Sequence, residues 1–278
     1  MERDDIDRPR LRMLRPLRRT ADRPARRFRR GVYLLPSMFT LGNLFCGYAC
    51  IVYAMRGEFS TAAPFIGFAM VLDMLDGRIA RMTGTSSDFG IELDSLADVV
   101  SFGMAPAILS LSWGLQPLGR LGWAVGFLFV AAAALRLARF NIQAGSQDKR
   151  YFVGMPSPAA AAVPAATVFA YPWGFQDSFN QSLLVMPMVI VPALLMVSTI
   201  RFRSFKTFDL QARRSYSVLL VVAVVMVLIT AQPEYLLVAM AYTYLASAFV
   251  ELLWTRIRRH GGHEEPKEEP PAKDTKAL

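Results

Sequence analysis

Long apolar stretches constrain this chain more than any other feature of its sequence. Several runs of roughly 20 residues carry almost no charge, and that is the length an α-helix needs to cross a bilayer. A soluble domain of 278 residues could bury a large core without such runs. A transmembrane β-barrel would show short alternating segments, which we do not find in this sequence. The sequence therefore predicts an all-α polytopic membrane protein.

About eight transmembrane helices account for the apolar runs. The predicted spans are 34–55, 61–80, 93–113, 121–140, 158–175, 183–200, 216–231 and 235–254. An even number of spans places the two ends of the chain on the same side of the membrane. The basic residues then gather on that side, so the positive-inside rule predicts that both termini are cytoplasmic.

The two ends differ in composition from the middle of the chain. We predict a basic cytoplasmic arm over 1–33, a transmembrane domain that carries the chemistry over 34–255, and a polar, disordered cytoplasmic tail over 256–278. The arm is rich in arginine and contributes much of the net charge of +9. It has a single aromatic residue, Phe28, among its arginines and no cleavage site after the first apolar run, so we expect it to contact anionic membrane lipid rather than nucleic acid or a secretion machinery.

A charged run interrupts the apolar pattern at the end of the second span and the start of the third. It reads D-x2-D-G-x2-A-R-x8-G-x3-D-x3-D. Ionised carboxylates at membrane depth cost several kcal/mol unless a partner compensates them, so the run is a candidate catalytic site. Its fixed positions are Asp73, Asp76, Gly77, Ala80, Arg81, Gly90, Asp94 and Asp98.

The spacing of the carboxylates predicts that they converge. Asp73 and Asp76 are three residues apart on one helix, and Asp94 and Asp98 are four apart on the next, so each pair shares a face. The intervening loop folds the second helix back on the first. Four carboxylates suit hard cations such as Mg²⁺ or Mn²⁺ rather than zinc, because both histidines lie in the tail and the cysteines read as packing residues of the first span.

The other fixed positions suit a diphosphate. Gly77, Gly90 and the small Ala80 allow a ligand or a neighbouring backbone to approach closely. Arg81 offers a planar fork of donors that fits a phosphate group. The competing interpretation is a structural network that pairs Asp73 or Asp76 with Arg78 or Arg81, but such a network has no need of the two glycines.

At these residues the chain resembles the CDP-alcohol phosphatidyltransferase family, because all eight fixed positions of that family's signature are present. The resemblance implies a six-helix membrane core, two divalent cations, a homodimer, and displacement of CMP from a CDP-linked lipid by an alcohol. It also implies that Asp73, Asp76, Asp94 and Asp98 bind the metals, with Asp98 as the base, and that Gly77, Ala80, Arg81 and Gly90 contact the CDP-lipid. Thr40 and Asn43 of the first span join that CDP-lipid set, although Asn43 could instead hydrogen-bond a neighbouring helix.

Further residues resemble one subfamily, the membrane-embedded phosphatidylserine synthases of bacteria and archaea. The similar segments are Ser101 to Ala107, Arg136 to Asn141 and Phe152 to Pro158. The resemblance implies an integral protein of a prokaryotic inner or plasma membrane with a cytoplasmic active site. Arg136 and Arg139 lie three residues apart at a cytoplasmic helix end, where they could hold the serine carboxylate or the lipid phosphate, or contact lipid headgroups. Together with Asn141 they are the candidate acceptor-binding residues.

The resulting expectation is transfer of a phosphatidyl group from CDP-diacylglycerol to L-serine. Three other acceptors stay open within the same chemistry: glycerol 3-phosphate, inositol phosphate and choline. A different class of function, an ion-coupled transporter whose carboxylates line an ion pathway, also remains open. The glycines and Arg81 argue against it, because ion coordination alone has no use for a phosphate contact.

Overall fold

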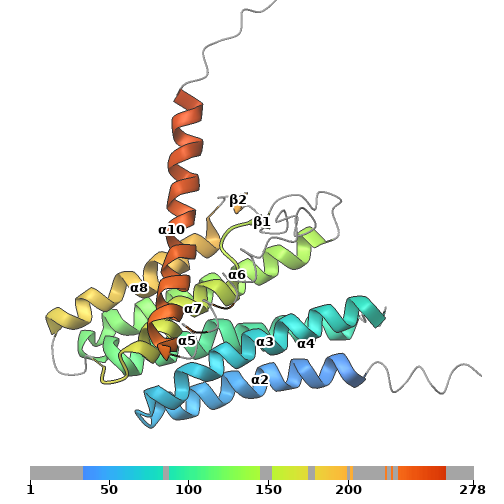
Figure 1. Ribbon diagram of the computed structural model, residues 1–278, viewed down its shortest axis with the longest axis horizontal. Helices are drawn as coiled ribbons and strands as arrows, with labels where there is room; N and C mark the ends of the chain where they lie inside the picture. Colours follow the sequence, from blue (N-terminus) through green and yellow to red (C-terminus); the bar gives the residue numbers. More distant parts are fainter. Residues whose placement is uncertain are drawn as a thin grey trace, which may run out of the picture.

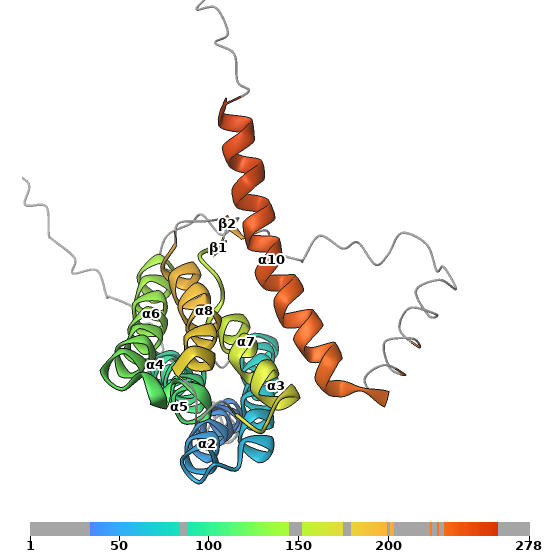
Figure 2. The ribbon, with the colours of Figure 1, turned by 90° about the vertical axis from the view of Figure 1, so that its left-hand side faces the viewer.

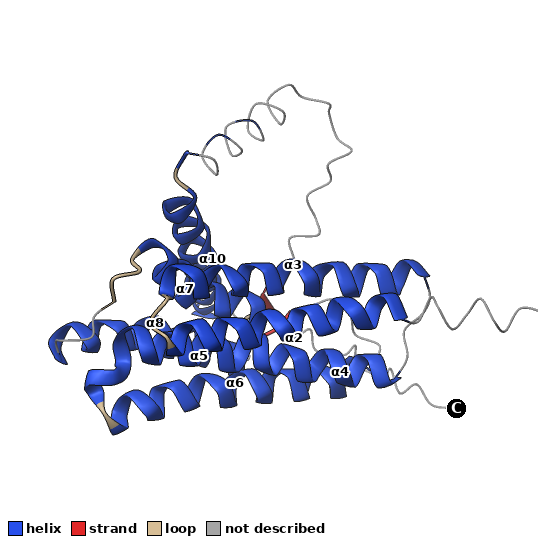
Figure 3. Cartoon of the chain, turned by 90° about the horizontal axis from the view of Figure 1, so that it is seen from below, coloured by secondary structure: helices blue, strands red, loops and turns tan. Residues whose placement is uncertain are grey.

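The computed structural model describes residues 34–83, 88–144, 152–174, 179–198, 201–202, 223, 227 and 231–260. These residues are almost entirely helical (Figure 3). The α-helices are α2 (Leu34–Met55), α3 (Phe59–Thr83), α4 (Asp88–Asp98), α5 (Ala105–Ser110), α6 (Arg120–Ala144), α7 (Ser157–Ala170), α8 (Phe179–Val197) and α10 (Pro233–His260). Within the described ranges, β-structure is limited to β1 (Phe152–Val153), which pairs antiparallel with β2 (Arg201–Phe202).

The prediction of an all-α polytopic membrane protein is confirmed. Five helical segments of the described chain are long and apolar enough to cross a membrane, and each corresponds to one predicted span. The third is a composite rod in which α4 continues through η1 (Val99–Met104), α5, η2 (Leu111–Leu115) and η3 (Gln116–Leu118). The segments are Ser37–Met55, Phe59–Met82, Asp88–Leu118, Arg120–Ile142 and Phe179–Val197.

The remaining three predicted spans have different outcomes. The span predicted at 158–175 is α7, a shorter apolar helix that ends at Ala170. The span predicted at 216–231 lies outside the described residues apart from positions 223, 227 and 231. The span predicted at 235–254 falls within α10, which crosses the other helices at a steep angle instead of running alongside them (Figures 1 and 2). Helix α10 also continues to His260, inside the predicted tail.

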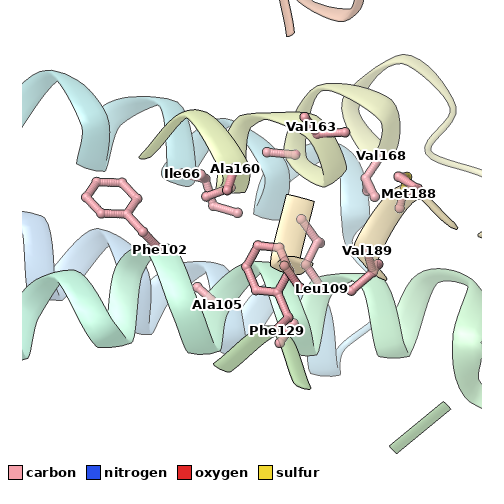
Figure 4. Close-up of a cluster of buried hydrophobic side chains, with 14 of the residues drawn as sticks. Ile66, Phe102, Ala105, Leu109, Phe129, Ala160, Val163, Val168, Met188 and Val189 are labelled. Atoms are coloured by element: carbon pink, nitrogen blue, oxygen red, sulfur yellow. The ribbon is translucent and has the colours of Figure 1, made fainter. Parts of the chain in front are cut away.

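A six-segment bundle holds the core. Helices α2, α3, α6, α7 and α8 and the composite rod lie side by side (Figure 1), with α7 in contact with α3, α8 and α10. Because lipid is as apolar as these side chains, close packing rather than water exclusion holds the helices together. Small alanines on the buried face of α7 permit that approach. The large side chains of the core come from six elements, α3, η1, α5, α6, α7 and α8 (Figure 4): Ile66, Phe102, Leu109, Phe129, Val163 and Val189.

The composite rod contains a π-helical turn directly after Asp98. The backbone N–H of Ala105 bonds to the carbonyl of Val100, five residues back. Pro106 has no N–H to donate, so an ordinary α-helical bond to Phe102 cannot form there. Single π turns recur at functional sites because they change which side chains face a neighbouring helix. Here the turn begins at the residue that follows the candidate base.

Helices α2 and η1 touch at a glycine. A Cβ atom added at Gly47 would lie 2.5 Å from Ser101 Oγ and 2.7 Å from Ser101 Cα. The same Ser101 hydroxyl donates a 2.8 Å hydrogen bond to the Asn43 carbonyl one turn earlier. The missing side chain at Gly47 therefore lets α2 carry Asn43 against the rod.

Gly47→Ala is expected to destabilise the protein by about 1–3 kcal/mol, because the added methyl group forces the two backbones apart. Thermal unfolding in detergent measures the effect. Gly67→Ala on α3 is the matched control, since a Cβ there meets nothing within 4 Å. Equal melting temperatures for Gly47→Ala and Gly67→Ala would contradict the close α2–η1 contact.

Candidate active site

Three of the four predicted aspartates meet in space. Asp73 comes from α3, and Asp94 and Asp98 come from α4. One carboxylate oxygen from each lies within 4.8 Å of those of the other two. Asp98 is only 8% exposed, whereas Asp73 and Asp94 are partly buried. The spacing argument predicted that all four carboxylates converge, and in the structure three of them do so.

Asp76 stands beside this group rather than within it. It is 6% exposed and accepts a hydrogen bond from the hydroxyl of Thr40. It is near enough to interact electrostatically with both Asp73 and Asp94. The four carboxylates therefore form one acidic site, with Asp73, Asp94 and Asp98 as its tightest part.

The acidic site fits a divalent cation. Like charges this close repel strongly where water is scarce, and a bound cation would offset that repulsion. Asp94 Oδ1 is buried and has no hydrogen-bond partner among the described residues, so this oxygen is available to coordinate a cation. All donors are carboxylate oxygens, which Mg²⁺ and Mn²⁺ prefer.

Helix α2 supports both acidic helices from one side. The Asn43 side-chain amide donates a 3.1 Å hydrogen bond to Asp98 Oδ1, and Thr40 donates to Asp76 one turn earlier. Both supporting side chains are buried. Of the two possibilities for Asn43, the structure therefore shows a hydrogen bond to a neighbouring helix, and that helix is the one that carries Asp98.

The remaining positions of the signature differ in exposure. Gly77 is exposed, and a Cβ there would meet nothing within 4 Å. Arg81 is also exposed, one turn beyond Gly77 on α3, while Ala80 and Gly90 are partly buried. Packing within the described residues therefore gives no reason for a glycine at position 77.

A basic side chain reaches the acidic site from α6. Arg136 is partly buried and lies within electrostatic reach of Asp73, Asp98 and the hydroxyl of Tyr244. Arg78 and Arg81, the arginines considered for a structural ion-pair network, are both exposed. The positively charged side chain that faces the carboxylates therefore comes from α6, whereas the structural-network interpretation placed it on α3.

The other two predicted acceptor residues lie further along α6. Arg139 is partly buried one turn beyond Arg136. Asn141 donates a 2.9 Å hydrogen bond to Ser95 Oγ, one residue after Asp94 on α4. Asn141 thus ties α6 to the helix that carries two of the aspartates.

Sequence reasoning missed two contacts around Arg136. Its Nη1 donates a 2.9 Å hydrogen bond to Ser157 Oγ at the start of α7. Tyr244 comes from α10. The sequence could not predict either contact, because Ser157 and Tyr244 lie far from Arg136 along the chain. The apolar pattern also does not determine how their helices are rotated about their own axes.

Comparisons with known proteins point to one family. The sequence model of the CDP-alcohol phosphatidyltransferase family matches residues 33–200. A protein of Helicobacter pylori named CDP-diacylglycerol–serine O-phosphatidyltransferase is 42% identical over 176 residues, which cover 63% of this chain and 74% of that protein. A protein of Bacillus subtilis with the same name is 36% identical over 172 residues, covering 62% and 91%.

A third relative comes from an archaeon. The archaetidylserine synthase of Methanothermobacter thermautotrophicus is 34% identical over 170 residues, which cover 60% of this chain and 69% of that protein. The four aspartates, the α2 residues that support them and Arg136 all lie within the range that the family model matches. Helix α10 and its Tyr244 lie beyond it.

Proposed function

This chain belongs to the CDP-alcohol phosphatidyltransferase family, and from that premise we propose that it transfers the phosphatidyl group of CDP-diacylglycerol to L-serine, with release of CMP. The names of its relatives support serine as the acceptor and do not favour glycerol 3-phosphate, inositol phosphate or choline. The observation that carries the chemistry is the convergence of Asp73, Asp94 and Asp98 beside a partly buried arginine, Arg136.

Asp98 is the proposed general base. Its buried carboxylate is held at one oxygen by Asn43, which leaves the other oxygen to accept the proton of the serine hydroxyl. The hydroxyl oxygen attacks the lipid-side phosphorus of CDP-diacylglycerol. The bond from that phosphorus to the CMP oxygen breaks, and the proton stays on Asp98. No covalent enzyme intermediate is needed.

Asp73, Asp76, Asp94 and Asp98 are the proposed ligands of two divalent cations, Mg²⁺ or Mn²⁺. When bound, these cations neutralise the diphosphate and the charge of the leaving CMP. Thr40 and Asn43 keep Asp76 and Asp98 oriented for this task through their hydrogen bonds. We propose that they act in this way rather than only as direct contacts to the nucleotide.

Gly77, Ala80, Arg81 and Gly90 are the proposed contacts to the CDP-lipid. Exposed Arg81 can bind a phosphate oxygen, and the bare backbone at Gly77 leaves room for the diphosphate beside the aspartates. Arg139 and Asn141 are assigned to the acceptor side together with Arg136, because they follow it on α6.

Gly77→Ala is expected to raise KM for CDP-diacylglycerol about tenfold or more while leaving the melting temperature unchanged or slightly higher. The methyl group meets no atom of the described residues, so the expected clash is with the bound lipid substrate. Steady-state kinetics in mixed micelles and thermal unfolding measure the two effects. Gly67→Ala, on the same helix and equally open, should change neither. An unaltered KM for Gly77→Ala would remove Gly77 from the CDP-lipid site.

The experiment that tests the acceptor is a panel of alcohols. Purified protein receives CDP-diacylglycerol and one of L-serine, glycerol 3-phosphate, inositol phosphate or choline, and the lipid product is resolved by chromatography. We expect phosphatidylserine with serine and no product with the others. Faster transfer to any other alcohol would reassign the acceptor.

The apolar helices and the family identify an integral membrane protein. We propose that it lies in the inner or plasma membrane of a prokaryote as a homodimer, with both termini and the active site on the cytoplasmic side. The basic residues of the arm support that orientation and a contact with anionic lipid. The division into a basic arm, a catalytic membrane domain and a polar tail remains part of this proposal.

A further inference from the structure

Ser157 contacts the one basic side chain that the described structure places against the aspartates. Its hydroxyl accepts a 2.9 Å hydrogen bond from Arg136 Nη1, and Ser157 itself is 0% exposed. An arginine side chain has many rotamers, and a buried hydrogen bond at one end of its guanidinium selects among them. Arg136 Nε is also buried and has no partner within the described residues. The guanidinium is thus held at Nη1 and keeps one donor, Nε, without a partner in the described part of the chain.

The position of Ser157 is itself fixed from α8. Gly154 adopts a φ of 89°, and a Cβ there would collide with the Met196 carbonyl. The next residue, Met155, is fully buried and donates a 3.0 Å backbone hydrogen bond to the Leu195 carbonyl. This turn leads directly into α7, whose first residue is Ser157. The Ser157 hydroxyl therefore follows a segment whose backbone is held against α8 by these contacts.

We propose that Ser157 is a positioning residue that orients the Arg136 guanidinium to bind the carboxylate of the acceptor serine. This inference rests on the proposed function. In serine, two carbon atoms separate the hydroxyl oxygen from the carboxylate carbon, so a hydroxyl at Asp98 brings the carboxylate close by. Arg136 lies within electrostatic reach of Asp98 and presents the planar donor fork that suits a carboxylate.

The test is a separation of the two Michaelis constants. Ser157→Ala should raise KM for serine about tenfold, since it removes the charged hydrogen bond that orients the Arg136 guanidinium. KM for CDP-diacylglycerol should stay within about twofold of the wild-type value. Ser157→Cys, with nearly the same volume and a weaker acceptor, should act in the same direction. Ser157→Thr keeps the hydroxyl and should restore the wild-type KM. Ser110→Ala is the control, because that buried hydroxyl donates within its own helix, to the Pro106 carbonyl.

A double variant tests whether Ser157 acts through Arg136. Combined with Arg136→Gln, Ser157→Ala should lower kcat/KM for serine no further than Arg136→Gln does alone. Multiplied losses in the double variant, or equal changes in both Michaelis constants, would overturn the positioning role. Wild-type protein that makes no phosphatidylserine would instead contradict the proposed function itself, so the two failures are distinguishable.

Discussion

Asp98→Asn is expected to reduce kcat for phosphatidylserine formation by about a thousandfold or more. The amide cannot accept the hydroxyl proton, and loss of a general base alone costs about 10²–10⁴-fold. The substitution also removes one charge from the acidic site that would hold the cations. The protein should still fold, because the amide oxygen can accept the hydrogen bond from Asn43, and fewer like charges remain together. Transfer of labelled serine measures the rate, and thermal unfolding measures the stability.

Asp88→Asn is the matched control for this variant. Asp88 lies in the first turn of the same helix and is exposed, outside the group of Asp73, Asp94 and Asp98. Its neutralisation should leave kcat within about twofold and cost only a few tenths of a kcal/mol through the helix dipole. Near-normal activity in Asp98→Asn would remove Asp98 from the role of base.

Removal of divalent cations with a chelator should abolish transfer, and Mg²⁺ or Mn²⁺ should restore it. The carboxylates would lose the charge that offsets their mutual repulsion, and the diphosphate would lose its neutralising partner. Binding should also stabilise the fold, by about 2.7 kcal/mol at a hundredfold excess over Kd. The melting temperature with and without cation therefore gives a readout that is independent of turnover.

The variant Asp94→Asn tests whether the cation that stabilises the fold binds at the acidic site. Asp94 Oδ1 is the buried carboxylate oxygen that lacks a protein partner in the described part of the chain, so the variant should lose most of the cation-induced rise in melting temperature. Asp88→Asn should keep that rise. A cation response that survives Asp94→Asn unchanged would place the metals elsewhere.

The sequence predicted most of what depends on spacing along one helix. Asp73 on α3 and the pair Asp94 and Asp98 on α4 meet because each pair of aspartates in the run lies three or four residues apart and the connection folds back. The apolar runs likewise predicted the helices with good bounds, since length and hydrophobicity determine a span. Both inferences use periodicity that a single helix imposes.

Contacts between remote helices were beyond that reasoning. The bonds from Asn43 to Asp98 and from Arg136 to Ser157 depend on how neighbouring helices are rotated and how deeply they pack. The steep crossing of α10 has the same origin: an apolar pattern predicts that a helix forms, but not the angle at which it meets its neighbours (Figure 2). Likewise, only the structure shows that packing among the described residues does not require a glycine at position 77.

One measurement tests the central claim most directly. Purified protein in mixed micelles with Mg²⁺ or Mn²⁺ receives CDP-diacylglycerol and labelled L-serine, and CMP and phosphatidylserine are quantified in the same samples over time. We predict equal amounts of the two products, no CMP without serine, and neither product after chelation. Uptake of serine by proteoliposomes without CMP release, or CMP release without phosphatidylserine, would contradict phosphatidyl transfer at this site.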